Sequence, residues 1–231
     1  METSTKLLVG LCLVSIFACR SNEKKSQIEK EKQTALEINM LSDFEKRTGW
    51  KLLFDGRSLN GWKTFNEDVI SGWKVVDGVL YNSGVGSDHG GDIITMEQFN
   101  NFELYLEWNV SSESNSGIFI RAQENIVDAI YKTAPEYQLS DDMGIKKERE
   151  KNQLTAACYG IYEPVGAKIN PAGEWNSSKM VVNGHHVEHW LNGKKVLEYE
   201  IWSDDWKKRK NESKWKNEIH YGMAKKGHIG L

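Results

Sequence analysis

The feature that most constrains the fold is the recurrence of Asn-Gly or Asp-Gly pairs between short segments of alternating apolar and polar residues. The clearest stretch, KMVVNGHHVEHWLNGKKVLEYEI (residues 179–201), is interrupted by Asn183-Gly184 and Asn192-Gly193. Such pairs supply the positive φ angles that two-residue hairpin turns require. The sequence therefore predicts a three-stranded antiparallel meander here, and a smaller hairpin around Asp77-Gly78.

Alternation elsewhere extends this pattern along the chain. In NFELYLEWNV (residues 101–110) apolar side chains occupy every second position, so one face of a strand is expected to enter a core. Segments with a helical period are almost absent, and 20 Gly against 3 Pro accompany the repeated turn pairs. We predict an all-β protein, either an antiparallel β-sandwich or a jelly roll.

Length and charge restrict the class of protein. The 231 residues, of which 39% are hydrophobic, suit one domain with a buried core. The formal net charge of −3 shows no basic excess, so nucleic acid is not expected as a partner. The oligomeric state is not determined by these quantities.

The N-terminal segment predicts export and lipid attachment. Residues 7–18 form an apolar run behind Lys6 that is too short to span a bilayer and resembles a signal-peptide core. A small residue precedes Cys19, as at the cleavage site of bacterial lipoproteins, so a lipid anchor is expected to be the only attachment to a membrane. We therefore predict a signal peptide over 1–18, a lipidated Cys19 with a charged tether over 19–47, and a domain over 48–231 in the bacterial cell envelope. An ordinary signal peptide cut nearby is the alternative.

One predicted strand, SNSGIFIRA (residues 114–122), follows a tight turn and places an arginine outside the core. Ile118 and Ile120 share one face, and Arg121 lies on the other. The planar guanidinium of arginine can hold a carboxylate, a pair of hydroxyls or a developing enolate oxygen, and it also serves in structural ion pairs. Both roles are open for Arg121.

A second predicted strand, PEYQLSDD (residues 135–142), is unusually rich in oxygen. Alternation places Glu136 and Gln138 on one face, and Asp141 follows where the strand ends. If the two strands are neighbours, Arg121 meets Glu136 across a concave face, as general acid and base chemistry needs. A solvated face of a sheet is the alternative.

The remaining candidates are aromatic and histidine side chains. Trp175 lies in a loop, where a flat ring can stack on a sugar, whereas Trp73 is in register with core residues. His185, His186 and His189 do not match a common zinc spacing, so no metal ligands are assigned, and His189 is a candidate acid or base. The run DDWKKRKNESKWKN (residues 204–217) is expected to be a solvated loop because acidic residues interrupt its lysines.

Several ordered motifs resemble the bacterial 3-keto-disaccharide hydrolase domain family, which has a concanavalin-A-like jelly-roll fold. The likeness runs from Gly49 to the end of the chain and rests on GWKLLFDGRSLNGWK, NSGIFIR, PEYQLSDD, EWNSSKMVVNGHHVEHWLNGKKV and GHIGL. It implies an exported enzyme that cleaves glycosides whose sugar has been oxidised at C3. The chain stops where family members continue, so the domain is expected to lack its final strand.

The resemblance also implies a sugar-facing surface, on which our hypothesis places a base, an enolate stabiliser and hydroxyl ligands. The base is Glu136 or His189, and Arg121 or a bound divalent cation stabilises the enolate. Gln138 and Asp141 bind hydroxyls or a metal ion. The motif positions implied are Asn115, Ser116, Gly117, Arg121, Glu136, Gln138, Asp141, Trp175, Asn176, His189 and Asn192.

Two other functions fit the same residues. A non-catalytic, lectin-like carbohydrate-binding module uses the same fold with the same aromatic and amide side chains. A surface lipoprotein with an inert sheet is the third reading. An oligosaccharide or glycoside is the expected ligand of the first two.

Overall fold

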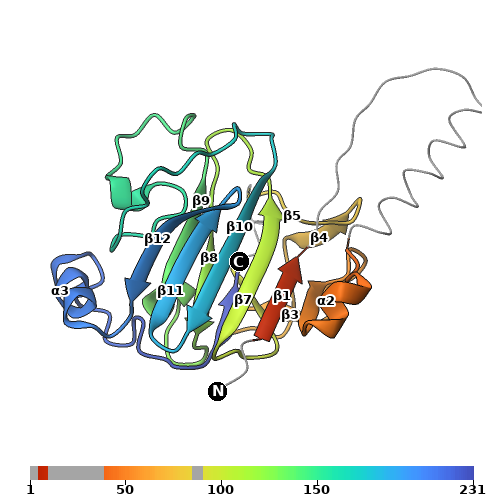
Figure 1. Ribbon diagram of the computed structural model, residues 1–231, viewed down its shortest axis with the longest axis horizontal. Helices are drawn as coiled ribbons and strands as arrows, with labels where there is room; N and C mark the ends of the chain where they lie inside the picture. The colour runs from red at the N-terminus through yellow and green to blue at the C-terminus, as the bar shows by residue number, and fades with distance from the viewer. Residues whose placement is uncertain (1–4, 10–38, 85–90) are drawn as a thin grey trace, which may run out of the picture.

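The computed structural model describes residues 5–9, 39–84 and 91–231 of the chain. Two β-sheets pack face to face, and a separate hairpin lies beside them (Figure 1). The larger sheet has the strand order β12 (Lys194–Glu200), β11 (His186–Leu191), β10 (Asn176–Asn183), β7 (Phe102–Trp108), β1 (Thr5–Val9) and β2 (Trp50–Phe54).

The smaller sheet lies behind the larger one in Figure 1. It contains the strands formed by SNSGIFIRA and PEYQLSDD. Its order is β3 (Trp62–Thr64), β6 (Ile93–Thr95), β13 (His228–Gly230), β8 (Asn115–Ala122) and β9 (Glu136–Ser140). The hairpin consists of β4 (Trp73–Val76) and β5 (Val79–Asn82). Apart from the pairs that involve β1, the strand pairs in all three sheets are antiparallel. The predicted all-β sandwich is confirmed.

The core fills the space between the two sheets. Along β7, Phe102 and Leu104 are buried while the residues between them are partly exposed, as the alternation predicts. They meet Ile118 and Ile120 of β8 and Tyr137 of β9 in one cluster. Burial of each such side chain contributes roughly 1.5–3 kcal/mol, so this cluster holds the sheets together.

The three predicted hairpins form at the expected places. Asp77 and Gly78 between β4 and β5 have φ of 51° and 79°, and Asn192 and Gly193 between β11 and β12 have 48° and 78°. Between β10 and β11 the positive φ falls on Gly184, at 59°, while Asn183 remains the last residue of its strand. The turn pair therefore marks this hairpin correctly but lies one residue early.

Strand β1 comes from the segment predicted to be a signal peptide. It pairs in parallel with both β7 and β2. This placement differs from the expectation that residues 1–18 lie outside the domain. Backbone N–H and C=O groups of any extended segment can satisfy two facing strand edges, so the pairing does not identify the segment's role. Export and lipidation stay predictions, and Cys19 lies outside the described residues.

Within residues 39–84 and 91–231, two α-helices lie at the periphery of the sheets (Figure 1). Helix α2 (Asp43–Arg47) falls in the predicted tether and begins with a capping box between Ser42 and Glu45. Helix α3 (Asp204–Glu212) replaces the solvated loop expected there. The loop prediction was wrong because Ser203 caps the helix and Trp206 is buried against Tyr199. Two short 3₁₀ turns, η2 (Ile130–Lys132) and η3 (Lys151–Gln153), complete the elements of the described residues. In the described part of the chain, no helix is long and apolar enough to span a membrane.

Candidate functional site

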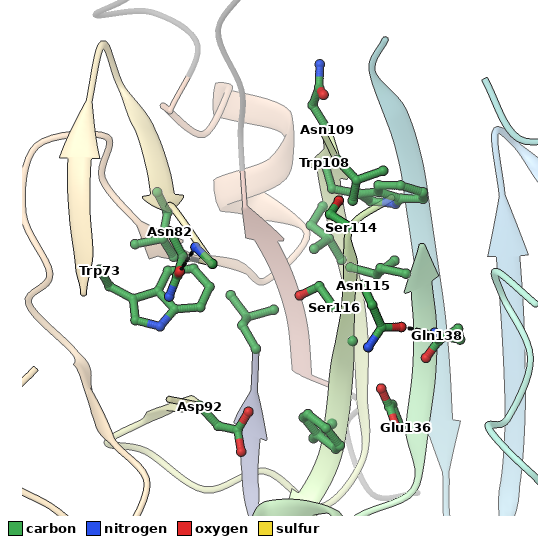
Figure 2. Close-up of a pocket in the computed structure, with 18 of the residues that line it drawn as sticks. Trp73, Asn82, Asp92, Trp108, Asn109, Ser114, Asn115, Ser116, Glu136 and Gln138 are labelled. Carbon is green, nitrogen blue, oxygen red and sulfur yellow. Dashed lines mark hydrogen bonds between the residues drawn. The ribbon is translucent and has the colours of Figure 1, made fainter. Parts of the chain in front are cut away.

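A cleft of about 920 Å³ opens between the β4–β5 hairpin and strands β8 and β9. Figure 2 shows Trp73 and Asn82 of the hairpin on one wall and the polar residues of β8 and β9 on the other, with Asp92 at the lower end. A space of this size accommodates a ligand of a few hundred daltons. The predicted residues that line it are Asn115, Ser116, Gly117, Glu136, Gln138 and Trp175.

Glu136 lies on one wall of the cleft (Figure 2). In the register of β8 and β9 it lies opposite Phe119, and Gln138 lies opposite Gly117, so both side chains leave the sheet on the face away from Tyr137. The Glu136 side chain is only 9% exposed. Burial, opposed by the Lys214 ammonium and assisted by the Asp92 carboxylate, raises the pKa of its carboxyl to about 8. Near neutral pH such a group exchanges a proton easily.

Gly117 makes room for that carboxyl. A Cβ atom at position 117 would come within 2.7 Å of Glu136 Cγ and 2.9 Å of Glu136 Cδ. Real Cβ atoms essentially never approach so closely, and Gly117 has no positive φ that would itself demand glycine. The missing side chain at position 117 is therefore what lets Glu136 lie against β8.

Gln138 presents an unused acceptor beside Glu136. Its Nε2 donates to Asn115 Oδ1, which fixes the amide orientation on the wall (Figure 2). Its Oε1 is buried and has no hydrogen-bond partner among the described residues. Leaving a buried acceptor unpaired costs roughly 1–3 kcal/mol. A ligand hydroxyl that donates to Gln138 Oε1 would recover this cost.

Arg121 does not reach the cleft. Its backbone has φ of 55°, which breaks the alternation of β8, and its guanidinium donates to the carbonyl oxygens of Asn100 (3.0 Å) and Gly184 (2.7 Å). The side chain is 2% exposed, and burial lowers its pKa to about 10. The expected meeting of Arg121 with Glu136 was wrong, and Arg121 instead ties β8 to the turn between β10 and β11.

His189 lies in the core between the sheets, without any exposed surface. Its Nδ1 is 2.9 Å from the carbonyl oxygen of Ala156, and its ring packs 4.7 Å from that of Tyr137. Burial lowers the pKa of His189 to about 4, so the ring is neutral at physiological pH. His189 does not line the cleft. This agrees with the alternation along β11, which puts His189 on the same face as Val187.

Three further predicted positions stabilise loops. Asp141 accepts hydrogen bonds from the backbone N–H groups of Glu113 (3.0 Å) and Gly144 (2.9 Å), and these bonds lower its pKa. Asn176 Oδ1 accepts from Asn192 Nδ2 at 2.8 Å, where Asn192 holds the turn after β11. Their hydrogen-bonding groups are used within the protein, so these three side chains are structural.

Of the cleft residues that were not identified from the sequence, three bear on the chemistry or the shape of the site. Asp92 stands before β6, Lys214 follows α3, and Trp73 was expected in the core. Trp73 Nε1 donates to Gly91 O, which leaves the ring on the hairpin wall. Asp92 and Lys214 each lie in a charged or glycine-rich stretch with no local pattern, so only the tertiary structure shows that they line the cleft.

Among the described residues, three possible metal-ligating side chains converge at one place, away from the cleft. They are His186, Glu188 and Glu198, on the outer face of β11 and β12. The Lys195 ammonium forms an ion pair with each carboxylate, 3.2 Å from Glu188 and 2.6 Å from Glu198. This cluster is an ion-pair network of the sheet surface.

Comparisons with known proteins agree on a carbohydrate-active family. The model of the 3-keto-alpha-glucoside-1,2-lyase-like domain matches residues 49–231. A 3-keto-disaccharide hydrolase of Bacteroides thetaiotaomicron is 32% identical over 86% of this chain and 79% of that protein. The resemblance inferred from the sequence motifs is confirmed.

Solved structures show the same fold. A "putative glycosyl hydrolase" of Parabacteroides distasonis is 38% identical and superposes with a TM-score of 0.78 over 83% of this chain and 90% of that one. A second protein of that organism with the same description is 23% identical, with a TM-score of 0.51 over 74% of this chain and 90% of that chain, and supports the fold alone.

Proposed function

We propose that this chain, which belongs to the 3-keto-alpha-glucoside-1,2-lyase-like domain family, is a carbohydrate hydrolase that cleaves 3-keto-glycosides. The observation that carries the proposal is the Glu136 carboxyl, buried in a sugar-sized cleft with a pKa of about 8. The Gln138 and Asn115 amides beside it supply hydrogen-bonding groups for sugar hydroxyls.

The proposed reaction begins with removal of a proton. A ketone at C3 acidifies the proton on C2, and the Glu136 carboxylate accepts it. The electron pair of the C2–H bond forms an enolate, which then expels the C1 substituent as the C1–C2 double bond forms. Water adds at C1, C2 regains a proton, and the net result is hydrolysis. This route needs no covalent glycosyl-enzyme and no oxocarbenium-like transition state.

A second reaction is favoured by one specific observation. The Asp92 carboxylate is close enough to raise the pKa of Glu136, and Figure 2 shows both carboxyl groups turned towards the open space of the cleft. Two carboxyl groups that face one cleft are the usual equipment for direct hydrolysis of an unoxidised glycoside. The two reactions differ in their substrate, because elimination needs a 3-keto-glycoside whereas direct hydrolysis acts on the unoxidised glycoside.

Incubation of the full-length protein with a 3-keto-disaccharide and with its unoxidised parent tests the proposal. We expect cleavage of the keto form only, and a loss of about 10²–10⁴-fold in kcat/KM in Glu136→Gln. Glu163→Gln, which removes an exposed carboxylate outside the cleft, is the matched control and should retain activity. Cleavage of the parent glycoside would favour the two-carboxylate reaction instead. Binding of both sugars without turnover would identify a lectin-like module.

A further inference from the structure

One positively charged side chain of the described residues lines the cleft, and it comes from a segment that the sequence pattern does not indicate as part of a site. Lys214 is the one basic residue among the described residues that line the cleft. It follows α3, in the run predicted to be a solvated loop, and is brought to the β8–β9 wall by the packing of its neighbour Trp215. Trp215 is 4% exposed, and its ring stacks 4.8 Å from that of Tyr221.

The ammonium of Lys214 is held in place by aromatic rings. Its Nζ lies 3.9 Å from the ring centroid of Tyr159 and 4.3 Å from that of Trp215. Those two residues are joined by a hydrogen bond of 2.9 Å from Trp215 Nε1 to Tyr159 O. Cation–π contacts orient an ammonium group without using its N–H donors on a carboxylate.

The positive charge of Lys214 is not neutralised by a direct ion pair with another described residue. None of the ion pairs within 4 Å in the described part of the chain includes Lys214, although Glu136 is close enough to act on it electrostatically. Partial desolvation lowers the pKa of Lys214, and the Glu136 carboxylate opposes that shift. The side chain is exposed to the cleft, so its donors are open to a ligand.

We propose that Lys214 is a catalytic residue whose ammonium binds the C3 oxygen of the substrate and stabilises the enolate formed there. This inference rests on the proposed function. A base on one side of C2 and a cation at the C3 oxygen are the two groups that enolate formation needs, and the cleft brings Glu136 and Lys214 together. Arg121, expected from the sequence in this role, is buried elsewhere.

The step is balanced between these two residues and the sugar. The C2–H bond breaks, its proton goes to a Glu136 oxygen, and its electron pair forms the C2=C3 bond. The C3=O π pair moves to the oxygen, which carries a negative charge next to the Lys214 ammonium. The electron pair on the C3 oxygen then reforms C3=O, and the C2=C3 pair moves to form C1=C2. The bond from C1 to the oxygen of the departing group breaks. The departing oxygen takes a proton from solvent.

The test compares Lys214→Met with wild type on a 3-keto-disaccharide, together with Lys214→Arg and the control Lys216→Met, an exposed lysine in the same loop. Exchange of the C2 proton with solvent deuterium is measured beside steady-state kinetics. We expect Lys214→Met to lose roughly 10²–10³-fold in kcat with KM within a few-fold, and to lose C2 exchange in parallel. Lys214→Arg is expected to restore part of kcat, and Lys216→Met to match wild type.

Three results would overturn the inference. Retention of kcat within about threefold in Lys214→Met excludes the role, and a change in KM alone makes Lys214 a binding group. Full activity of Lys214→Met that a chelator abolishes assigns the enolate to a divalent cation. Thermal melting of each variant separates these outcomes from loss of folding. If wild type itself cleaves no 3-keto-glycoside, the proposed function fails first and the role of Lys214 with it.

Discussion

At the scale of single residues, one carboxyl group illustrates both the reach and the limit of sequence patterns. Alternation in PEYQLSDD places Glu136 on the face opposite Tyr137, and the structure confirms it. The pKa of Glu136 depends on burial, Asp92 and Lys214, which lie 44 and 78 positions away in the chain. No local pattern contains that information.

The raised pKa of Glu136 predicts how activity depends on pH. A base acts as its carboxylate, so kcat/KM should rise about tenfold per pH unit below pH 8 and level off above it. Measurement of kcat/KM for a 3-keto-disaccharide between pH 5 and 9 checks this. A flat profile, or one that has already levelled off by pH 6, would contradict the assignment.

The same shift predicts a dependence of stability on pH. Between pH 4.5 and 8 folded Glu136 holds a proton that the unfolded chain has released, so its contribution to the free energy of unfolding falls as pH rises. The slope is at most about 1.4 kcal/mol per pH unit. Because Glu136→Gln cannot ionise, it should gain thermal stability relative to wild type as pH is raised from 5 to 8. Equal melting shifts at both pH values would show that the carboxyl titrates normally.

Gly117 is predicted to act through Glu136. Gly117→Ala leaves the backbone unstrained but displaces the carboxyl, so kcat/KM should fall by about 10–100-fold, as is usual for a small misplacement of a catalytic group, with little change in melting temperature. In the Glu136→Gln background the same change should have no further effect, because the two act as one unit. Additive losses would assign Gly117 a separate role.

At the scale of elements, strands and hairpins follow the sequence closely, whereas the side-chain direction at Arg121 and the segment of helix α3 do not. Strands β7 and β8 begin and end near the predicted segments, but φ of 55° at Arg121 turns its side chain away from the face that alternation assigns. Helix α3 forms where charge patterning predicts a loop, because a capping serine and one buried tryptophan outweigh the lysines. Both departures are set by contacts with other elements.

Arg121 is predicted to be structural. Arg121→Met removes the donors to Asn100 O and Gly184 O, which link β8 to the β10–β11 turn, and we expect a loss of about 2–4 kcal/mol in the free energy of unfolding. The kcat on a 3-keto-disaccharide should stay within a few-fold of wild type. Denaturant unfolding and steady-state kinetics measure the two quantities. A loss of more than a hundredfold in kcat with unchanged stability would return Arg121 to the active site.

At the scale of the whole molecule, the domain is expected to be held at a membrane by lipid on Cys19. Wild type expressed in a bacterial host should be recovered in the membrane fraction, and Cys19→Ser should be released into the soluble fraction, because one thiol carries the anchor. Cys158→Ser is the control, since that thiol is buried in the core. Soluble wild type, or membrane-bound Cys19→Ser, would contradict the proposal.

The sequence by itself determined the class of fold and one wall of the site. A side-chain period of two and turn pairs with positive φ act over a few residues, so they define antiparallel strands, the hairpins and the shared face of Glu136 and Gln138. Only the tertiary structure decided what faces that wall. Asp92, Trp73 and Lys214 reach the cleft through packing between segments distant in the chain, and the same packing buries Arg121 and His189. Contacts at long range depend on how whole sheets pack, which no short pattern encodes.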